Sequence, residues 1–171
     1  MEMKMDFLVL ALAALVPLII GFLWYSKMLF ANAWMNSAGL SEENLKGGNM
    51  AMIFGLTYLF SFFLATAIQF MVIHQYSVFS IFADTPEFKD PTSELGMWAK
   101  DFFDKYGSNF RTFKHGVAHG VLSGIFFVLP VVGINALFER RSFKYIFIHT
   151  GFWTVTLALM GGIICQFASA Y

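Results

Sequence analysis

The sequence predicts an all-α polytopic membrane protein in which four hydrophobic helices cross the bilayer as an antiparallel bundle. Of its 171 residues, 58% are hydrophobic and 13% are charged, and the mean hydropathy is +0.65. Soluble domains carry about 25% charged residues, so water is not the main solvent of this chain. The apolar stretches follow one another with one sizeable polar segment among them, which predicts a single domain over residues 1–171.

Four stretches are long enough to cross hydrocarbon. A bilayer core about 30 Å thick needs roughly 20 apolar residues in a helix. The stretches that meet this requirement without any Asp, Glu, Lys or Arg are Phe7–Tyr25, Ala51–Ile73, Gly116–Phe138 and Tyr145–Phe167. One such charge at a helix centre costs about 2.5 to 3.5 kcal/mol on insertion scales, so all four are expected to insert unaided. The first has no small-x-small cleavage site, so we expect it to be retained.

The polar part of the second connection, residues 84–109, predicts an amphipathic helical cap. Pro91 is expected to open its helix and Gly107 to close it. Four apolar side chains then share one face: Leu95, Trp98, Phe102 and Tyr106. This face either lies on the membrane surface or covers the ends of the bundle. The missing basic face favours the second interpretation, in which the four side chains form a lid.

Charge bears on partners and on orientation. Eleven basic residues balance eleven acidic residues, so no net field favours nucleic-acid binding.

The short connection 139–144 makes the third and fourth spans antiparallel neighbours, and it contains Arg140, Arg141 and Lys144. Positive charge favours the cytoplasmic side, which predicts a multi-pass protein of the cell inner membrane with both termini and the second connection on the periplasmic side.

Two prolines occupy matching positions in the first and third spans. Pro17 precedes Tyr25 by eight residues, and Pro130 precedes Phe138 by eight. A proline inside a helix removes a hydrogen bond and kinks the axis. Matched kinks in two halves of a chain can mark a transport pathway, and the alternative is a tolerated kink in each of two unrelated helices.

The third span begins with a stripe of small residues. Gly116, Gly120 and Gly124 form two consecutive G-x-x-x-G steps. Such a stripe allows a second helix to approach closely, which is how helices associate where lipid removes the hydrophobic driving force. The partner is either another helix of this chain or a second protomer, and we favour the intramolecular partner.

Three histidines are expected near one bilayer surface. His115 and His119 are four residues apart beside the glycine stripe, and His74 follows the second span on the same side. Three imidazoles can hold a metal ion or ligate haem. The alternative is that they hydrogen-bond across helices or to headgroups. Gly116 stands where a zinc-protease motif has its general base. No paired nucleophile and base is found, so we expect no enzyme and assign no cofactor.

Several motifs resemble a known family. The first half of the pattern is Gly21-Phe22-Leu23-Trp24-Tyr25-Ser26, Phe30, Ala33-Trp34-Met35 and Gly39-Leu40-Ser41-Glu42-Glu43. The second half is Asn135-Ala136-Leu137-Phe138-Glu139, Ile148, Gly151-Phe152-Trp153 and Met160-Gly161. The chain resembles the bacterial family catalogued as domain of unknown function 1761, although the polar segment from about Asp84 to Asn109 is longer than expected for it. The resemblance implies a small four-helix membrane protein and carries no activity, ligand or catalytic residue.

Three functional hypotheses follow from these features. The first is a non-enzymatic membrane protein that binds a lipid, an apolar ligand or a partner membrane protein, with the Leu95–Tyr106 face as its lid. The alternative is a small transporter or channel subunit that acts as an oligomer. The third is a membrane metal or haem protein that uses His74, His115 and His119. The expected partners are membrane lipids, together with a second copy of the chain or another membrane protein.

Overall fold

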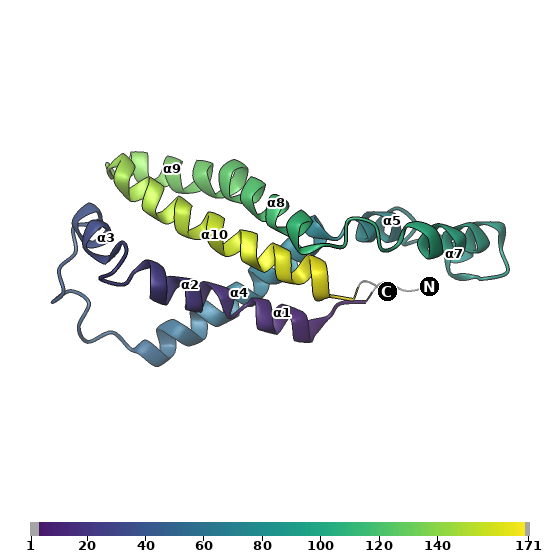
Figure 1. The fold of residues 1–171 in the computed structure, drawn as a ribbon, viewed down its shortest axis with the longest axis horizontal. Helices are drawn as coiled ribbons and strands as arrows, with labels where there is room; N and C mark the ends of the chain where they lie inside the picture. The colour runs from purple at the N-terminus through teal and green to yellow at the C-terminus, as the bar shows by residue number, and fades with distance from the viewer. Residues whose placement is uncertain (1–3, 170–171) are drawn as a thin grey trace.

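The computed structural model describes residues 4–169, and every regular element in this part of the chain is a helix (Figure 1). Four segments are long and apolar enough to cross a membrane: Phe7–Trp24, Met50–Val72, Phe113–Phe138 and Phe143–Phe167. The predicted all-α class with four spans is therefore confirmed. An arm of short helices extends the molecule at one end of the bundle (Figure 1).

The third and fourth spans begin earlier than the hydropathy pattern predicts. Helix α8 (Phe113–Ser123) starts three residues early, where the Thr112 side chain accepts a hydrogen bond from a first-turn backbone N–H. Helix α10 (Phe143–Phe167) starts two residues early, where Ser142 does the same. The early turns contain Lys114 and Lys144. A lysine in the first turn extends its charged end toward water, so a charge-free window places these boundaries too late.

Each proline follows an interruption of regular α-helix. The first span divides into α1 (Phe7–Ala13) and α2 (Val16–Trp24), and the third into α8, the π-helical turn η1 (Gly124–Val128) and α9 (Leu129–Phe138). Pro17 is the second residue of α2, and Pro130 is the second residue of α9. Proline lacks an N–H and crowds the carbonyl four residues earlier, which disturbs the hydrogen bonds of the preceding turn. A role for these interruptions in transport stays a prediction.

Helix α10 is the centre of the bundle. In its most apolar 18-residue window 56% of the residues are buried, against 17–28% in the other three spans. Helices α1, α2, α8, α9 and α4 (Met50–Val72) pack around it. The main core joins α1, α4 and α10 through Leu10, Ala13, Ala65, Ile68, Val72, Leu157, Met160 and Ile164. The other spans are therefore positioned chiefly by their contact with α10.

The closest helix contact joins α8 to α10 along Gly116, Gly120, Gly124 and Gly161, which we call the glycine seam. A Cβ atom added at Gly116 would lie 2.0 Å from the carbonyl oxygen of Gly161. One added at Gly120 would lie 2.2 Å from the carbonyl oxygen of Leu157. Only glycine permits backbones this close. The structure therefore places the glycine stripe against a helix of the same chain.

Short helices connect the spans. Helix α3 (Ala31–Ala38) follows the first span and ends at Gly39, whose φ of 70° is the left-handed conformation of a helix C-cap. The arm between the second and third spans contains α5 (Gln75–Ile81), α6 (Pro86–Lys89) and α7 (Glu94–Tyr106). The sequence predicted only the last of these three helices.

Helix α7 starts three residues later than predicted. The backbone N–H and hydroxyl of Thr92 donate to the Asp90 carboxylate, which forms a turn around Pro91. Ser93 then caps α7 by accepting a hydrogen bond from Gly96 N. These hydrogen bonds hold Pro91 in a turn, so α7 begins only after Pro91.

The apolar face of α7 packs within the arm, which extends from one end of the bundle (Figure 1), and a role of this face as a lid stays a prediction. Its most buried side chains are Ala99 and Phe103, which contact Phe79 of α5 and Phe88 of α6. Of the four predicted lid residues, Leu95 and Phe102 are half-buried, and Trp98 and Tyr106 are exposed. The apolar face of α7 packs within the arm because α5 and α6, which are close to it in sequence, supply an apolar partner.

The glycine seam predicts a clear difference between two Gly→Ala variants of the same span. Gly120→Ala forces α8 away from α10 and is expected to destabilise the fold by about 1 to 3 kcal/mol, the usual range for overpacking. Gly133→Ala has nothing within 4 Å of its new Cβ. It is expected to be neutral or to stabilise by up to about 1 kcal/mol through helix propensity. Unfolding in mixed detergent micelles measures both, and equal stabilities would contradict the seam.

Candidate functional site

Three imidazole rings meet where α4 ends and α8 begins. The Nε2 atom of His74 lies 3.0 Å from Nε2 of His115 and 3.1 Å from Nε2 of His119. One ring nitrogen from each of these histidines lies within 4.8 Å of the others. We call His74, His115 and His119 the histidine trio. The structure therefore brings together the three histidines that the sequence singled out.

The protonation of the imidazole nitrogens explains why this arrangement suits a metal ion. A neutral imidazole nitrogen carries either one hydrogen or one lone pair. The single Nε2 of His74 therefore cannot make full hydrogen bonds to both neighbouring nitrogens. A metal ion can accept a lone pair from all three. Tetrahedral zinc with ligands at about 2.0 to 2.1 Å separates them by roughly 3.3 Å, which is close to the two distances from His74 Nε2.

The same geometry favours a metal ion over haem as the ligand of the trio. The axial ligands of haem stand on opposite faces of the porphyrin ring. In the trio, the Nε2 atoms point toward one another and leave no room for a ring between them. The residues therefore fit a metal ion, with one coordination position left for a further ligand.

The glycine seam sets the direction in which the α8 histidines point. Its glycines face α10, so the adjacent stripe of α8 is turned toward the end of α4. Ser123 continues that stripe, and its hydroxyl lies 3.9 Å from the sulfur of Met71 on α4. His119 and His115 occupy the same stripe one and two turns earlier, respectively. Because α8 packs against α10, both of its imidazoles face His74, which follows α4.

The loop before α8 is tied to the end of α10. Arg111 donates through Nε to the carbonyl oxygen of Cys165 at 3.0 Å, and through its guanidinium to the carbonyl of Ala168. The N–H of Phe113 donates to the side chain of Gln166 at 3.0 Å. A cation at a helix C-terminus satisfies carbonyls that lack partners. These bonds hold the first turn of α8, and with it His115, against the rest of the bundle.

Phe110 packs against two rings of the trio and was missed at the sequence level. Its ring stacks on His74 with centroids 6.1 Å apart, and it lies 5.2 Å from the ring of His115. Its φ of 62° is in the left-handed region, which costs a non-glycine residue roughly 1 to 2 kcal/mol. A strained backbone conformation persists where the surrounding contacts hold it in place. Such conformations are often found at functional sites. A phenylalanine in a loop offers no sequence signal for this conformation.

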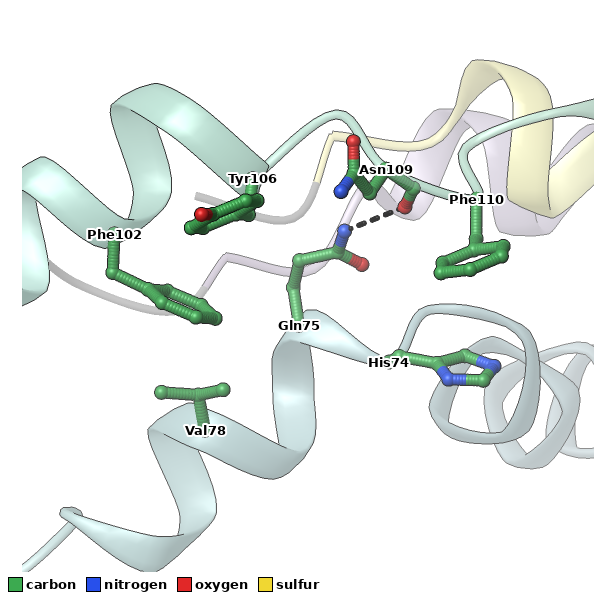
Figure 2. A pocket seen from close by; sticks show the side chains of 7 residues that line it. All are labelled: His74, Gln75, Val78, Phe102, Tyr106, Asn109 and Phe110. Carbon is green, nitrogen blue, oxygen red and sulfur yellow. Dashed lines mark hydrogen bonds between the residues drawn. The ribbon is translucent and has the colours of Figure 1, made fainter.

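A largely apolar pocket of about 370 Å³ adjoins His74 (Figure 2). Its other lining residues are Gln75, Val78, Phe102, Tyr106, Asn109 and Phe110. Two members of the predicted lid face, Phe102 and Tyr106, therefore lie at this pocket. In Figure 2 the His74 ring stands at the edge of the pocket below Phe110, with its outer nitrogen directed away from the other side chains.

Gln75 is the polar centre of the pocket. It is buried, and its Nε2 donates to the carbonyl oxygens of Gly107 at 2.9 Å and Asn109 at 3.0 Å. These bonds tie the start of α5 to the turn after α7. The Gln75 Oε1 atom is buried without a hydrogen-bond partner among residues 4–169. A buried acceptor in that state is best satisfied by a donor on a ligand or on water.

Comparison with known proteins identifies the family. A family model described as "Protein of unknown function (DUF1761)" matches residues 8–165, nearly the whole chain. The chain belongs to this family. The resemblance inferred from the sequence motifs is therefore confirmed, and the DUF1761 match spans the bundle, the arm and the histidine trio. No curated protein matches the chain, and no solved structure does.

Several of the motifs behind that resemblance meet at the end of the bundle opposite the trio, whereas Gly161 lies against Gly116 in the glycine seam. Trp24 donates its indole N–H to the carbonyl oxygen of Ile148, and the Tyr25 hydroxyl lies 3.1 Å from Nδ1 of His149. The Tyr25 ring also contacts Trp34 and Phe152. DUF1761 membership assigns no activity to either end, so function is argued from the geometry of the residues.

Proposed function

We propose that this DUF1761 protein is a non-enzymatic integral membrane protein that binds one divalent transition-metal ion through the histidine trio. The observation that carries the proposal is the position of His74 Nε2, within 3.1 Å of both other Nε2 atoms. Imidazole nitrogen suits zinc, copper and nickel. The bound ion would join the end of α4 to the first two turns of α8.

The chemistry of the donors supports binding without catalysis. The trio consists of neutral ligands, so a bound dication keeps its charge and attracts water or a small anion at the open position. Gly116 follows His115 where a zinc-protease motif carries its general base. The basic connection with Arg140, Arg141 and Lys144 favours the cytoplasm, which assigns the trio to the outer face of the inner membrane.

Metal titration tests this proposal. The detergent-purified protein, stripped with a chelator, is expected to bind one Co²⁺ or Zn²⁺ per chain, measured by visible absorption for Co²⁺ and elemental analysis for Zn²⁺. His119→Ala should weaken binding at least about a hundredfold, because losing an outer-shell partner alone costs about 10- to 100-fold.

His149→Gln is the matched control, because His149 contacts Tyr25 at the opposite end of the bundle. It should bind metal as the unaltered chain does. Absence of stoichiometric binding, or equal loss in the His119 and His149 variants, would overturn the proposal.

The pocket beside His74 supports a second candidate function, binding of an amphipathic ligand. Its volume of about 370 Å³ is in the usual range for ligand sites. Aromatic side chains supply its walls, and the unpartnered Oε1 of Gln75 is an acceptor for one hydroxyl or amide. This candidate keeps the hypothesis of an apolar ligand or lipid, with Phe102 and Tyr106 as part of the wall in place of a lid.

Filling the pocket tests the second candidate. Val78→Trp places a large ring in the space and is expected to remove from native mass spectra the copurifying small molecule that occupies this pocket. Ile81→Trp adds the same ring to the same helix at a side chain that is 73% exposed, and should retain that molecule. If the unaltered chain carries no such molecule, or if both variants retain it, the pocket is not a ligand site.

A further inference from the structure

A small polar cavity lies at the end of the bundle opposite the histidine trio. Its volume is about 170 Å³, and Asn135, Glu139, Tyr145 and His149 supply its polar groups. Asn135 and Glu139 are four residues apart along α9 and its C-cap, and Tyr145 and His149 are four apart on α10. Each pair therefore shares one face of its helix. The two faces meet across the tight connection between these helices.

His149 presents an unused hydrogen-bonding atom in this cavity. Its Nδ1 lies 3.1 Å from the hydroxyl of Tyr25, whereas its Nε2 is buried without a hydrogen-bond partner in the described part of the chain. Burial, together with Tyr145, raises the pKa of the Tyr25 phenol, so Tyr25 keeps its proton. His149 Nε2 then carries a hydrogen or a lone pair according to the direction of the Tyr25 bond. A hydroxyl group, which both donates and accepts, satisfies either form.

An apolar groove of about 420 Å³ adjoins the cavity. The two share Val132 and Trp153 as lining residues. From there the groove continues between α4, η1, α9 and α10, with walls that include Phe60, Leu64 and Phe127. It lies along the membrane-spanning segments, where acyl chains are the surrounding solvent. A polar cavity that leads into an apolar groove matches the two parts of a phospholipid.

The charges around the cavity select the kind of headgroup. The connection beside it carries Arg140, Arg141 and Lys144, against the single carboxylate of Glu139. Arg141 Nε lies 3.4 Å from Glu139, and the same guanidinium donates to the carbonyl oxygen of Ala38 at 2.8 Å. Three cations against one carboxylate leave an excess of positive charge, which attracts a phosphate diester of net negative charge.

We propose that this end of the bundle binds one anionic phospholipid with a hydroxyl-bearing headgroup, of the phosphatidylglycerol type. The headgroup hydroxyls occupy the cavity between Asn135 and His149. The phosphate lies at the basic connection, and one acyl chain lies in the groove past Val132 and Trp153. This site shares no residue with the histidine trio, so it is independent of metal binding.

Native mass spectrometry of the detergent-purified protein tests the site. The probes are phosphatidylglycerol, phosphatidylethanolamine and phosphatidylcholine with identical acyl chains. Phosphatidylglycerol is expected to bind about tenfold more tightly than phosphatidylcholine, the effect of one hydrogen bond to a charged group. Val132→Trp blocks the junction of cavity and groove, and should weaken phosphatidylglycerol binding about tenfold. Ile134→Trp, on the exposed side of the same helix, should leave it unchanged.

Three results would overturn the proposal. Equal affinity for all three lipids would show surrounding bilayer lipid only, and preference for phosphatidylethanolamine would contradict the anionic headgroup. Crosslinking of two chains through cysteines placed at Phe60 and Phe127, with no lipid retained, would assign the groove to a second copy of the chain. Because the lipid preference is measured on the unaltered chain, misfolding of Val132→Trp would not prevent a decision.

Discussion

The contact on which the rest of the structure depends is the backbone approach of α8 to α10 along the glycine seam. Hydrocarbon gives two apolar helices little reason to prefer each other over lipid, so close van der Waals packing must hold them together. The seam fixes the rotation of α8 about its axis. That rotation turns His115 and His119 toward the end of α4, where His74 meets them. The packing of α8 against α10 thus determines the geometry of the candidate metal centre.

The two ends of the bundle present different chemistry. At one end, three imidazoles converge beside Phe110. An apolar pocket adjoins them and contains Gln75 Oε1, which has no hydrogen-bond partner within residues 4–169. At the other, a cavity adjoins a groove in the hydrocarbon region and is lined by His149, whose Nε2 has no hydrogen-bond partner in the part of the chain that the structure describes. Helix α10 contributes to both ends, since its C-terminal carbonyls hold Arg111 and its first turns carry Tyr145 and His149. The first end suits a cation and the second an anionic lipid.

Much of the fold could be predicted from the sequence because its signals are local. Hydropathy identifies the four spans, and four-residue spacing places Gly116 beside His115 on neighbouring stripes of one helix. The arm could not be predicted, because α7 packs on α5 and α6 and its buried face depends on those partners. The left-handed backbone of Phe110 and the unpartnered atoms of Gln75 and His149 arise from contacts between distant segments. Helix starts were missed where Thr112 and Ser142 cap turns that contain lysine.

X-ray absorption at the zinc edge tests the central claim most directly, because it reads the ligands of the ion in the folded protein. The account predicts three imidazole nitrogens at about 2.0 to 2.1 Å from zinc, with one light atom completing the shell. His74→Ala should remove one imidazole from that shell, because His74 supplies the ligand that joins α4 to α8. A shell of oxygen atoms, or one unchanged in the His74 variant, would contradict the account.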